Sequence, residues 1–203
     1  MEQYIQEQLT VNSWIGHGEL PEHLCLKTEE AFEELWNLKP GYRNKIKIFG
    51  KIYDMPREQQ VYGVSQYTYS GTTFDTKEIP PMIEKYLDWA NHHHHHRQSS
   101  KPKYNMVLVN WYHNGNDNIG WHADNEKEII PGSDVMTISF GQSRVFKIKH
   151  NTDNTIAKNI PTQHNGFIIM GGSFQKEFKH SIPKTTKKTS QMPRVSITFR
   201  CFQ

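Results

Sequence analysis

The sequence predicts a mainly β protein with flanking helices, and two observations carry this prediction. After residue 103, short segments rich in branched and aromatic residues alternate with turn sequences such as Pro131-Gly132-Ser133 and Gly171-Gly172. Several short strands separated by turns are typical of an all-β sandwich or barrel. The chain has 203 residues, including 10 Phe, 9 Tyr and 5 Trp, which is enough for one domain with a sizeable core.

Two helices are expected ahead of the strands. A threonine and two glutamates, followed by apolar residues at helical spacing, predict a helix over residues 29–38. Two prolines open a second helix over residues 80–90, whose apolar side chains form one stripe. Five histidines, His92 to His96, are then expected in a low-complexity loop over residues 91–101. That loop should bind nickel or zinc only adventitiously, because tandem residues lack the convergent geometry of a catalytic metal site.

Strands are expected over residues 106–112, 135–140, 144–149, 166–170, 175–180 and 194–202. In the first of these strands, Asn110 and Tyr112 are polar side chains on one face. They are either core groups with hydrogen-bond partners or uncharged donors that orient a carboxylate.

The last strand divides into two faces. Arg194, Ser196, Thr198 and Arg200 share one face, and Val195, Ile197 and Phe199 share the other. The two arginines lie ~20 Å apart at the usual rise per residue, so they cannot grip the same carboxylate. Because guanidinium groups bind carboxylates bidentately and stay charged when buried, the pair suggests a small dicarboxylate held at both ends. An ordinary half-exposed strand with arginines at its ends is the alternative.

Two histidines and an aspartate form a candidate metal site. His122 and Asp124 flank one residue, so both point the same way in extended chain, although this spacing also fits a solvated turn. His180 lies in a separate expected strand. Two imidazoles and one carboxylate, remote in sequence but adjacent in a barrel, are the ligand set of a non-haem Fe(II) oxygenase. With the arginine pair, these residues predict an iron enzyme that uses 2-oxoglutarate and oxygen.

Charge is unevenly distributed along the chain. With 24 basic and 21 acidic residues, the formal net charge is +3, which is too small to identify a partner. Residues 39–51 contain five basic residues and no acid, and residues 176–200 contain seven basic residues and one acid. Such patches are the electrostatic footprint of nucleic-acid binding, although a solvated basic surface is the commoner explanation of a single run.

The cysteines and the hydropathy pattern indicate the cellular setting. Cys25 and Cys201 make neither a disulfide framework nor a zinc site, which favours a reducing, intracellular compartment. The N-terminal residues are polar, and no apolar stretch approaches the length of a membrane span. We therefore expect a soluble protein with no membrane partner.

Short motifs along most of the chain carry a family resemblance. They are Ile48-Phe49-Gly50-Lys51, Met55-Pro56-Arg57, Tyr67-Thr68-Tyr69-Ser70-Gly71, Asn110-Trp111-Tyr112, Ile119-Gly120-Trp121-His122-Ala123-Asp124-Asn125-Glu126, Pro131-Gly132-Ser133, Ile138-Ser139-Phe140-Gly141, His180-Ser181-Ile182-Pro183 and Pro193-Arg194-Val195-Ser196-Ile197-Thr198-Phe199-Arg200. In order and spacing, residues 40–203 resemble the AlkB family of Fe(II)/2-oxoglutarate dioxygenases, and the first three motifs are similar to its eukaryotic branch that repairs alkylated double-stranded DNA.

This resemblance implies a fold and a domain plan. The expected fold has a double-stranded β-helix, or jelly-roll, core over residues 104–203. A finger and base-recognition region is expected over residues 44–75. Residues 1–39 would form an N-terminal extension and helix, ahead of a dioxygenase domain over residues 40–203.

The resemblance also implies roles for individual residues. Iron ligation falls to His122, Asp124 and His180. Binding of 2-oxoglutarate falls to Asn110, Tyr112, Arg194, Ser196, Thr198 and Arg200, with Arg200 on the distal carboxylate. Substrate contact falls to Phe49, Arg57, Tyr67, Tyr69, Ser70, Glu126, Lys187 and Lys188.

Base recognition is expected in a pocket that receives a flipped nucleotide. Tyr69 would stack on the base, while Tyr67 and Glu126 would meet its polar edge. Three positions depart from the family pattern: Ser196 stands where Asn is usual, Asn125 where a second acid is frequent, and Tyr69 where Phe is usual. These departures bear on co-substrate affinity and substrate preference, whereas every metal ligand is retained.

Contacts with the nucleic-acid backbone and stack are expected outside the pocket. Phe49 matches the family's hydrophobic finger, which fills the space that the flipped base leaves, as apolar wedges do in DNA-bending proteins. Its alternative is a core position in a strand over residues 45–51. Lys187 and Lys188 lie in a loop where the DNA-repair branch has basic residues for phosphate contact.

The function implied by the resemblance is DNA repair by oxidative demethylation of N1-methyladenine and N3-methylcytosine. The reaction would consume 2-oxoglutarate and O2 and release succinate, CO2 and formaldehyde. Phe49 and the basic segment over residues 39–51 favour duplex DNA as the partner of a monomeric, nuclear enzyme, with a cytoplasmic or viral setting left open. The alternatives are a demethylase of single-stranded DNA or RNA and a non-catalytic nucleic-acid-binding module.

Overall fold

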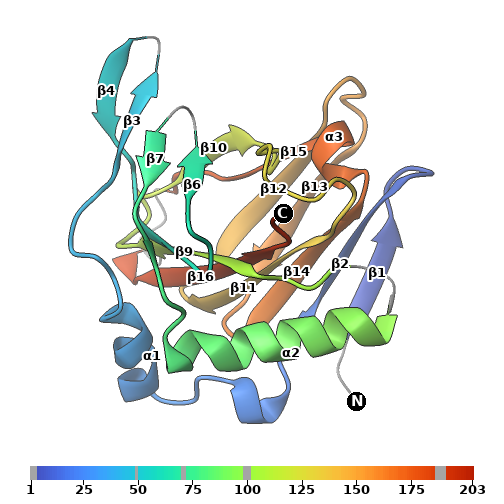
Figure 1. Cartoon of the computed structure of the whole chain (residues 1–203). Helices are drawn as coiled ribbons and strands as arrows, with labels where there is room; N and C mark the ends of the chain where they lie inside the picture. The colour runs from blue at the N-terminus through green and yellow to red at the C-terminus, as the bar shows by residue number, and fades with distance from the viewer. Residues whose placement is uncertain (1–3, 49, 70–71, 98–101, 186–190) are drawn as a thin grey trace.

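Two β-sheets pack face to face in the computed structural model, which describes residues 4–48, 50–69, 72–97, 102–185 and 191–203 (Figure 1). The larger sheet has eight strands, in the order β1 (Tyr4–Gln8), β2 (Ser13–Glu19), β14 (Gly166–Gly172), β11 (Val135–Gly141), β16 (Arg194–Arg200), β9 (Met106–Tyr112), β5 (Glu58–Tyr62) and β8 (Thr76–Lys77). The smaller sheet has four, in the order β10 (Ile119–His122), β15 (Phe178–Ile182), β12 (Arg144–His150) and β13 (Ala157–Thr162). Phe146 and Ile148 of the smaller sheet share a core cluster with Val135 and Ile168 of the larger. This architecture confirms the expected jelly-roll core.

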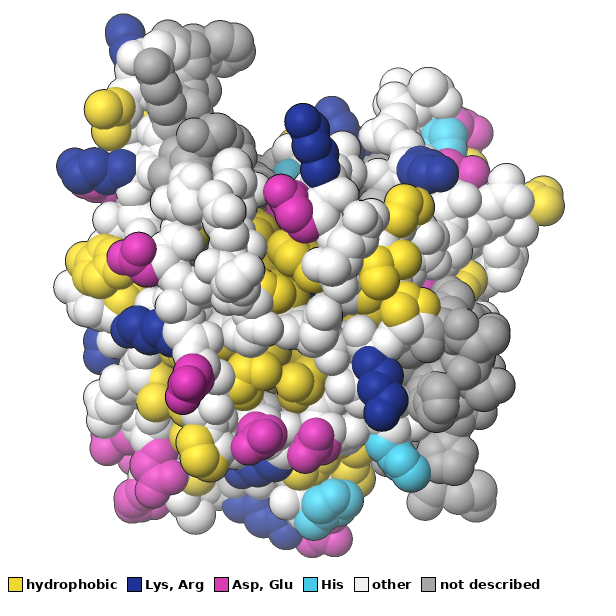
Figure 2. All heavy atoms as spheres, in the orientation of Figure 1, with side chains coloured by type: hydrophobic (Ala, Val, Ile, Leu, Met, Phe, Trp, Pro, Cys, Tyr) yellow, Lys and Arg dark blue, Asp and Glu magenta, His cyan; other side chains and the backbone are white. Residues whose placement is uncertain are grey.

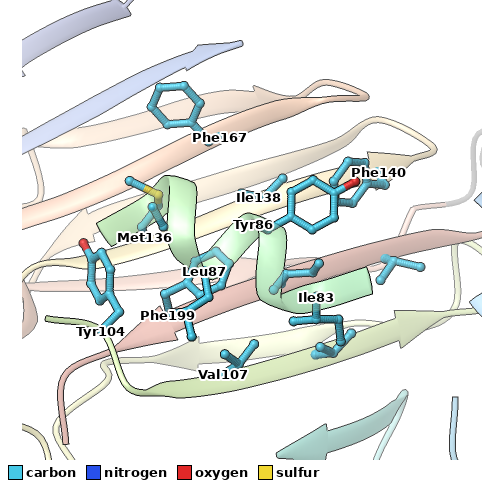
Figure 3. Packing of buried hydrophobic residues seen from close by; sticks show 14 of the residues in the cluster. Ile83, Tyr86, Leu87, Tyr104, Val107, Met136, Ile138, Phe140, Phe167 and Phe199 are labelled. Carbon is cyan, nitrogen blue, oxygen red and sulfur yellow. The ribbon is translucent and has the colours of Figure 1, made fainter. Parts of the chain in front are cut away.

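Helices cover the outer face of the larger sheet. They are η1 (Glu22–Leu24), α1 (Glu29–Trp36) and α2 (Pro81–Arg97). Figure 3 shows Ile83, Tyr86 and Leu87 of α2 against side chains of the sheet such as Val107 and Phe140, and all five residues belong to one buried cluster. The predicted apolar stripe of the second helix is therefore its buried face. No helix in the described ranges is long and apolar enough to cross a membrane.

The second helix is longer than predicted. It continues through the histidine run to Arg97, so the loop expected from residue 91 is wrong for residues 91–97. Asn91 explains the extension, because its amide donates to the carbonyl of Tyr104 at 3.0 Å and accepts from the Tyr104 N–H at 2.7 Å. The ring of His93 also packs against Trp89 and Phe167, with centroids 5.1 and 5.3 Å apart. Tertiary contacts thus override the modest helix propensity of histidine.

The strand expected over residues 175–180 is wrong in its first half. A short helix, α3 (Phe174–Glu177), precedes β15, which begins at Phe178. The rings of Phe174 and Phe178 stack with centroids 5.1 Å apart, and both residues are buried. Residues four apart meet in this way on a helical turn but lie far apart along a strand.

The N-terminal segment contributes two strands to the larger sheet. Strand β2 pairs with β14 along its whole length, and β1 pairs with β2. The indole of Trp14 lies directly over Gly171 of β14, where a side chain would overlap it. Strand β1 is short, mostly exposed and polar, which explains why hydropathy alone does not reveal these strands.

Two hairpins stand beside the mouth of the jelly roll. The first pairs β3 (Lys45–Ile48) with β4 (Lys51–Asp54), so the single strand considered for residues 45–51 is two strands. It projects from the body (Figure 1), and every residue of β4 is exposed. The second pairs β6 (Tyr67–Tyr69) with β7 (Thr72–Phe74).

The contact between Trp14 and Gly171 predicts a stability change. Gly171→Ala should lower the free energy of unfolding by about 1–3 kcal/mol, because the new methyl group would overlap the indole. Gly120→Ala is the matched control, since a methyl group there meets no atom within 4 Å. Urea unfolding checks both variants. A Gly171→Ala protein as stable as the control would show that β2 is only loosely held against β14.

Candidate metal and co-substrate site

Three side chains from the smaller sheet converge on one point. His122 of β10 and His180 of β15 are direct cross-strand partners, and Asp124 follows β10 by two residues. An oxygen of Asp124 lies 3.8 Å from Nε2 of His122, and its other oxygen lies 3.9 Å from Nε2 of His180. One ligand atom from each residue falls within 4.8 Å of the other two. The fold thus brings together the three predicted ligands.

Both imidazoles are prepared to donate an electron pair. Nδ1 of His122 lies 2.9 Å from the carbonyl oxygen of Gly120. Because a carbonyl only accepts, Nδ1 carries the proton and Nε2 is left as the ligand atom. Burial lowers the pKa of His180 to about 3 and also lowers the pKa of His122. The histidines are therefore neutral near pH 7, as metal binding requires.

Asp124 is held as a carboxylate by a buried arginine. Burial alone would raise its pKa, but the positive charge of Arg200, joined in acid by the protonated histidines, outweighs that effect and holds the pKa below its usual range. Nη2 of Arg200 donates to Oδ1 at 2.8 Å, and the Asp124 N–H donates to Oε1 of Gln175 at 2.9 Å. Among the described residues, Oδ2 has no hydrogen-bond partner. Two neutral imidazoles and one carboxylate with an available oxygen fit Fe(II).

A polar cavity extends from these ligands into the jelly roll. It is lined by Leu108, Asn110, Tyr112, Ile119, His122, Asp124, Thr137, Phe146, Met170, His180, Ile182, Arg194, Ser196, Thr198 and Arg200. The predicted polar faces of β9 and β16 thus both face the cavity, with Ser196 opposite Asn110 and Arg194 opposite Tyr112. Every residue of both strands is buried, so the alternative of a half-exposed last strand is wrong.

Arg194 offers a carboxylate site at the end of the cavity away from the metal ligands. Its guanidinium lies 4.9 Å from the centre of the Tyr112 ring, and Nη2 donates to Oγ of Ser139 at 2.9 Å. In the described part of the chain, Nε and Nη1 are buried without a hydrogen-bond partner. A buried guanidinium with N–H groups that have no partner is stabilised when a ligand supplies a hydrogen-bond acceptor, such as a carboxylate. Arg200, which the resemblance places on the distal carboxylate, is bound to Asp124, so Arg194 has more N–H groups available for a ligand.

Arg57, an expected substrate contact, lies inside the fold. It is buried, and its Nε donates to Oδ1 of Asn110 at 2.7 Å. Its Nη1 also donates to the carbonyl of Asn118 at 3.3 Å. With Oδ1 engaged by Arg57, the N–H groups of Asn110 are the atoms that can donate to a ligand in the cavity.

Two of the expected substrate residues meet beside the metal ligands. The hydroxyl of Tyr67 donates to Oε1 of Glu126 at 2.8 Å. Burial raises the pKa of Glu126, although the charge of Arg200 opposes the shift. The other expected contacts cannot be placed in the same way, because Phe49, Ser70, Lys187, Lys188 and the side chain of Tyr69 lie outside the described part of the chain.

Several supporting residues have no signal in the sequence. Gln175, which accepts from the Asp124 backbone, is 51 positions away. Arg144 donates to the carbonyls of Asn114, Asp117 and Pro183 at 3.2, 2.9 and 2.6 Å, and so joins two loops beside the cavity. Both roles depend on contacts between distant segments, which local periodicity does not report.

Known proteins share this combination of fold and site. A family model described as the 2OG-Fe(II) oxygenase superfamily matches residues 27–200. DNA oxidative demethylase ALKBH2 of Homo sapiens is 31% identical over 186 residues, covering 86% of this chain and 68% of that protein. The Mus musculus protein of the same name is 33% identical, covering 79% of this chain and 67% of its own length. The structure of OsALKBH1 superposes with a TM-score of 0.63 at 18% identity, covering 97% of this chain and 100% of that chain.

A jelly roll with a buried His-Asp-His site and an arginine-lined cavity defines a non-haem iron oxygenase. The chain belongs to the 2OG-Fe(II) oxygenase superfamily and, within it, to the AlkB family. It is a dioxygenase that depends on Fe(II), 2-oxoglutarate and O2. The family resemblance and the enzyme class expected from the sequence are confirmed.

The buried histidines predict an acid-sensitive metal-free protein. Their folded-state pKa values lie below the ~6.5 of an unfolded histidine, so the stability tied to their neutral forms is full above about pH 6.5 and is lost as the pH falls. The urea concentration at the unfolding midpoint should be lower at about pH 5 than at about pH 7, and His180→Asn should reduce that drop. His23→Asn, at an exposed position, should keep the full pH dependence. An undiminished drop in His180→Asn would contradict this account.

Proposed function

We propose that this dioxygenase removes methyl groups from N1-methyladenine and N3-methylcytosine in DNA, with duplex DNA as the favoured substrate. The observation that carries the proposal is the Tyr67–Glu126 pair beside the metal ligands, in a chain about one third identical to two DNA oxidative demethylases. A nuclear location and a monomeric state belong to the same proposal.

The co-substrate is held by groups at both ends of the cavity. His122, Asp124 and His180 bind iron, and Arg200 keeps the Asp124 carboxylate ionised and oriented. Arg194, whose Nε and Nη1 are buried without a partner among the described residues, would bind a carboxylate of 2-oxoglutarate. When bound, iron and 2-oxoglutarate supply with O2 the oxidation that converts the methyl group to formaldehyde and yields succinate and CO2.

Asn110, Tyr112, Ser196 and Thr198 complete the co-substrate site from neighbouring positions of β9 and β16. Thr198 is already paired through its hydroxyl with Thr137 at 3.2 Å, and Asn110 is fixed by Arg57. Polar side chains whose geometry is set before binding lose little conformational entropy when the ligand arrives. These four residues therefore position 2-oxoglutarate, while the arginines supply the charge.

Tyr67 and Glu126 read the polar edge of the target base. A base must leave the duplex stack to reach a buried iron, and a flipped base is recognised through its hydrogen-bonding edge and its faces. The pair offers a carboxyl group and a hydroxyl group in a position that burial keeps free of bulk water. Tyr69, at the end of the strand that begins with Tyr67, would supply the stacking surface, and Ser70 follows it in the chain.

The projecting β3–β4 hairpin favours a duplex partner. Ile52 and Tyr53 of β4 are 67% and 49% exposed, and Phe49 lies between the two strands in sequence, where an apolar wedge would enter the base stack. In Figure 2, Lys and Arg side chains lie on this hairpin and along the top of the view, with some acidic side chains among them, and further side chains of both kinds lie lower down. Lys187 and Lys188 would add phosphate contacts.

The Arg57–Asn110 bond predicts a change in co-substrate affinity. Arg57→Lys removes the Nε–H that holds the Asn110 amide, so KM for 2-oxoglutarate should rise about tenfold, the equivalent of one charge-assisted hydrogen bond. The kcat should change less, because no hydrogen bond joins the Asn110 side chain to a metal ligand within the described residues. Steady-state kinetics with 2-oxoglutarate varied checks this. Arg43→Lys, which alters a partly exposed ion pair with Asp117, is the control and should leave KM unchanged.

The proposed activity is tested by product release from matched oligonucleotides. Duplex and single-stranded DNA with one N1-methyladenine, and the corresponding RNA, are incubated with Fe(II), 2-oxoglutarate and ascorbate. Wild type should release formaldehyde and succinate fastest from the duplex, and Asp124→Ala should release neither, because it lacks a metal ligand. Faster turnover of single strands or RNA would favour the corresponding alternative. If wild type binds these oligonucleotides but demethylates none of them, the proposed function is wrong.

A further inference from the structure

The outer face of the smaller sheet carries a tryptophan and three lysines. Cross-strand partners and alternation assign to this face Trp121 of β10, Lys179 and Ser181 of β15, Val145, Lys147 and Lys149 of β12, and Ala157, Asn159 and Pro161 of β13. No carboxylate is among these residues of the four described strands. The face is therefore basic, whereas the whole chain is close to neutral.

Trp121 is the largest apolar side chain on this face. It is 44% exposed, although indoles are usually well buried. It directly precedes His122, so its side chain stands on the side of β10 opposite to the metal ligand. Because β10 is the outermost strand of its sheet, a chain that leaves the metal site reaches Trp121 by passing around a single strand.

The lysines are arranged around the indole. Nζ of Lys149 lies 4.7 Å from the centre of the Trp121 ring. Lys149 is also the direct cross-strand partner of Lys179, and like charges in that arrangement destabilise a sheet. Within the described residues, no carboxylate comes within 4.0 Å of Lys147, Lys149 or Lys179 to relieve this repulsion. An external polyanion would relieve it.

We propose that Trp121, Lys147, Lys149 and Lys179 form a stacking platform for unpaired nucleotides of the strand whose target base occupies the metal site. A base stacks on the indole while the flanking phosphates contact the lysines. This combination of an aromatic surface with cations is how proteins bind single strands without reading their sequence. The inference rests on the proposed function and extends it, because it names where the strand runs beyond the catalytic pocket.

The binding test uses a fluorescein-labelled single-stranded 15-mer with a central N1-methyladenine, followed by fluorescence anisotropy. Trp121→Ala should weaken binding about tenfold, the loss expected for one stacked base. Trp121→Phe retains an aromatic surface and should stay within about threefold of wild type. Val145→Ala removes another exposed apolar side chain from the same face and should bind as wild type does.

Salt dependence tests the lysines separately from the indole. Each lysine that contacts a phosphate should contribute about 0.7 to the slope of log Kd against log salt concentration for a single strand. Lys149→Gln and Lys179→Gln should each reduce the slope by about that amount, whereas Trp121→Ala should weaken binding with the slope unchanged. If the glutamine variants keep the wild-type slope, the lysines do not contact phosphate and the proposed platform is wrong.

A methylated trinucleotide separates failure of the platform from failure of the proposed function. It carries at most one nucleotide on each side of the methylated base, so Trp121→Ala should slow its demethylation less than that of the 15-mer. If the trinucleotide is demethylated and Trp121→Ala binds the 15-mer as tightly as wild type, the platform is wrong and the function stands. If neither oligonucleotide is demethylated, the function is wrong, and the anisotropy series still decides the platform. Preference for an acidic peptide over the 15-mer would also overturn the inference.

Discussion

The buried ion pair between Asp124 and Arg200 is the constraint on which the site depends. Arg200 belongs to the larger sheet and Asp124 follows a strand of the smaller one, so their 2.8 Å contact ties the two sheets together at the metal ligands. Both side chains are at most 4% exposed. A buried charge that loses its partner is strongly destabilising. Neither residue can therefore be replaced alone without disturbing both the ligand set and the packing of the jelly roll.

The same logic of burial governs the rest of the cavity. A strand buried on both faces is ordinarily apolar throughout, yet β9 and β16 are fully buried and carry a polar row on one face. Hydrogen bonds from Arg57 to Asn110 and from Arg194 to Ser139 support that row. The interior thus accepts a charged dicarboxylate because complementary donors are already inside it, fixed by the register of two neighbouring strands.

The sequence predicts features that follow from the local alternation of residues along a strand. It does not predict features that depend on contacts between residues distant in the sequence. Alternation along the chain predicts both faces of the last strand, and its polar face lines the cavity. The residue types His122, Asp124 and His180 predict the metal ligands, and the structure brings these three side chains together. Spacing does not say which end of that strand lies beside the metal ligands, whereas the structure pairs Arg200 with Asp124. The helical histidine run depends on the Asn91–Tyr104 bonds, and the start of β15 depends on a phenylalanine stack.

Because His122 and His180 are cross-strand partners, binding of iron would stabilise the pairing of β10 with β15 at the edge of the smaller sheet. Strand β10 has four residues and only one neighbour in its sheet, with an irregular register. Such edges open with a small free-energy cost. An ion held by His122 and His180 would stabilise the closed form, in proportion to the logarithm of its concentration over its Kd. Iron scarcity would then loosen the strand that carries the ligands, so that supply of the ion controls the integrity of its own site.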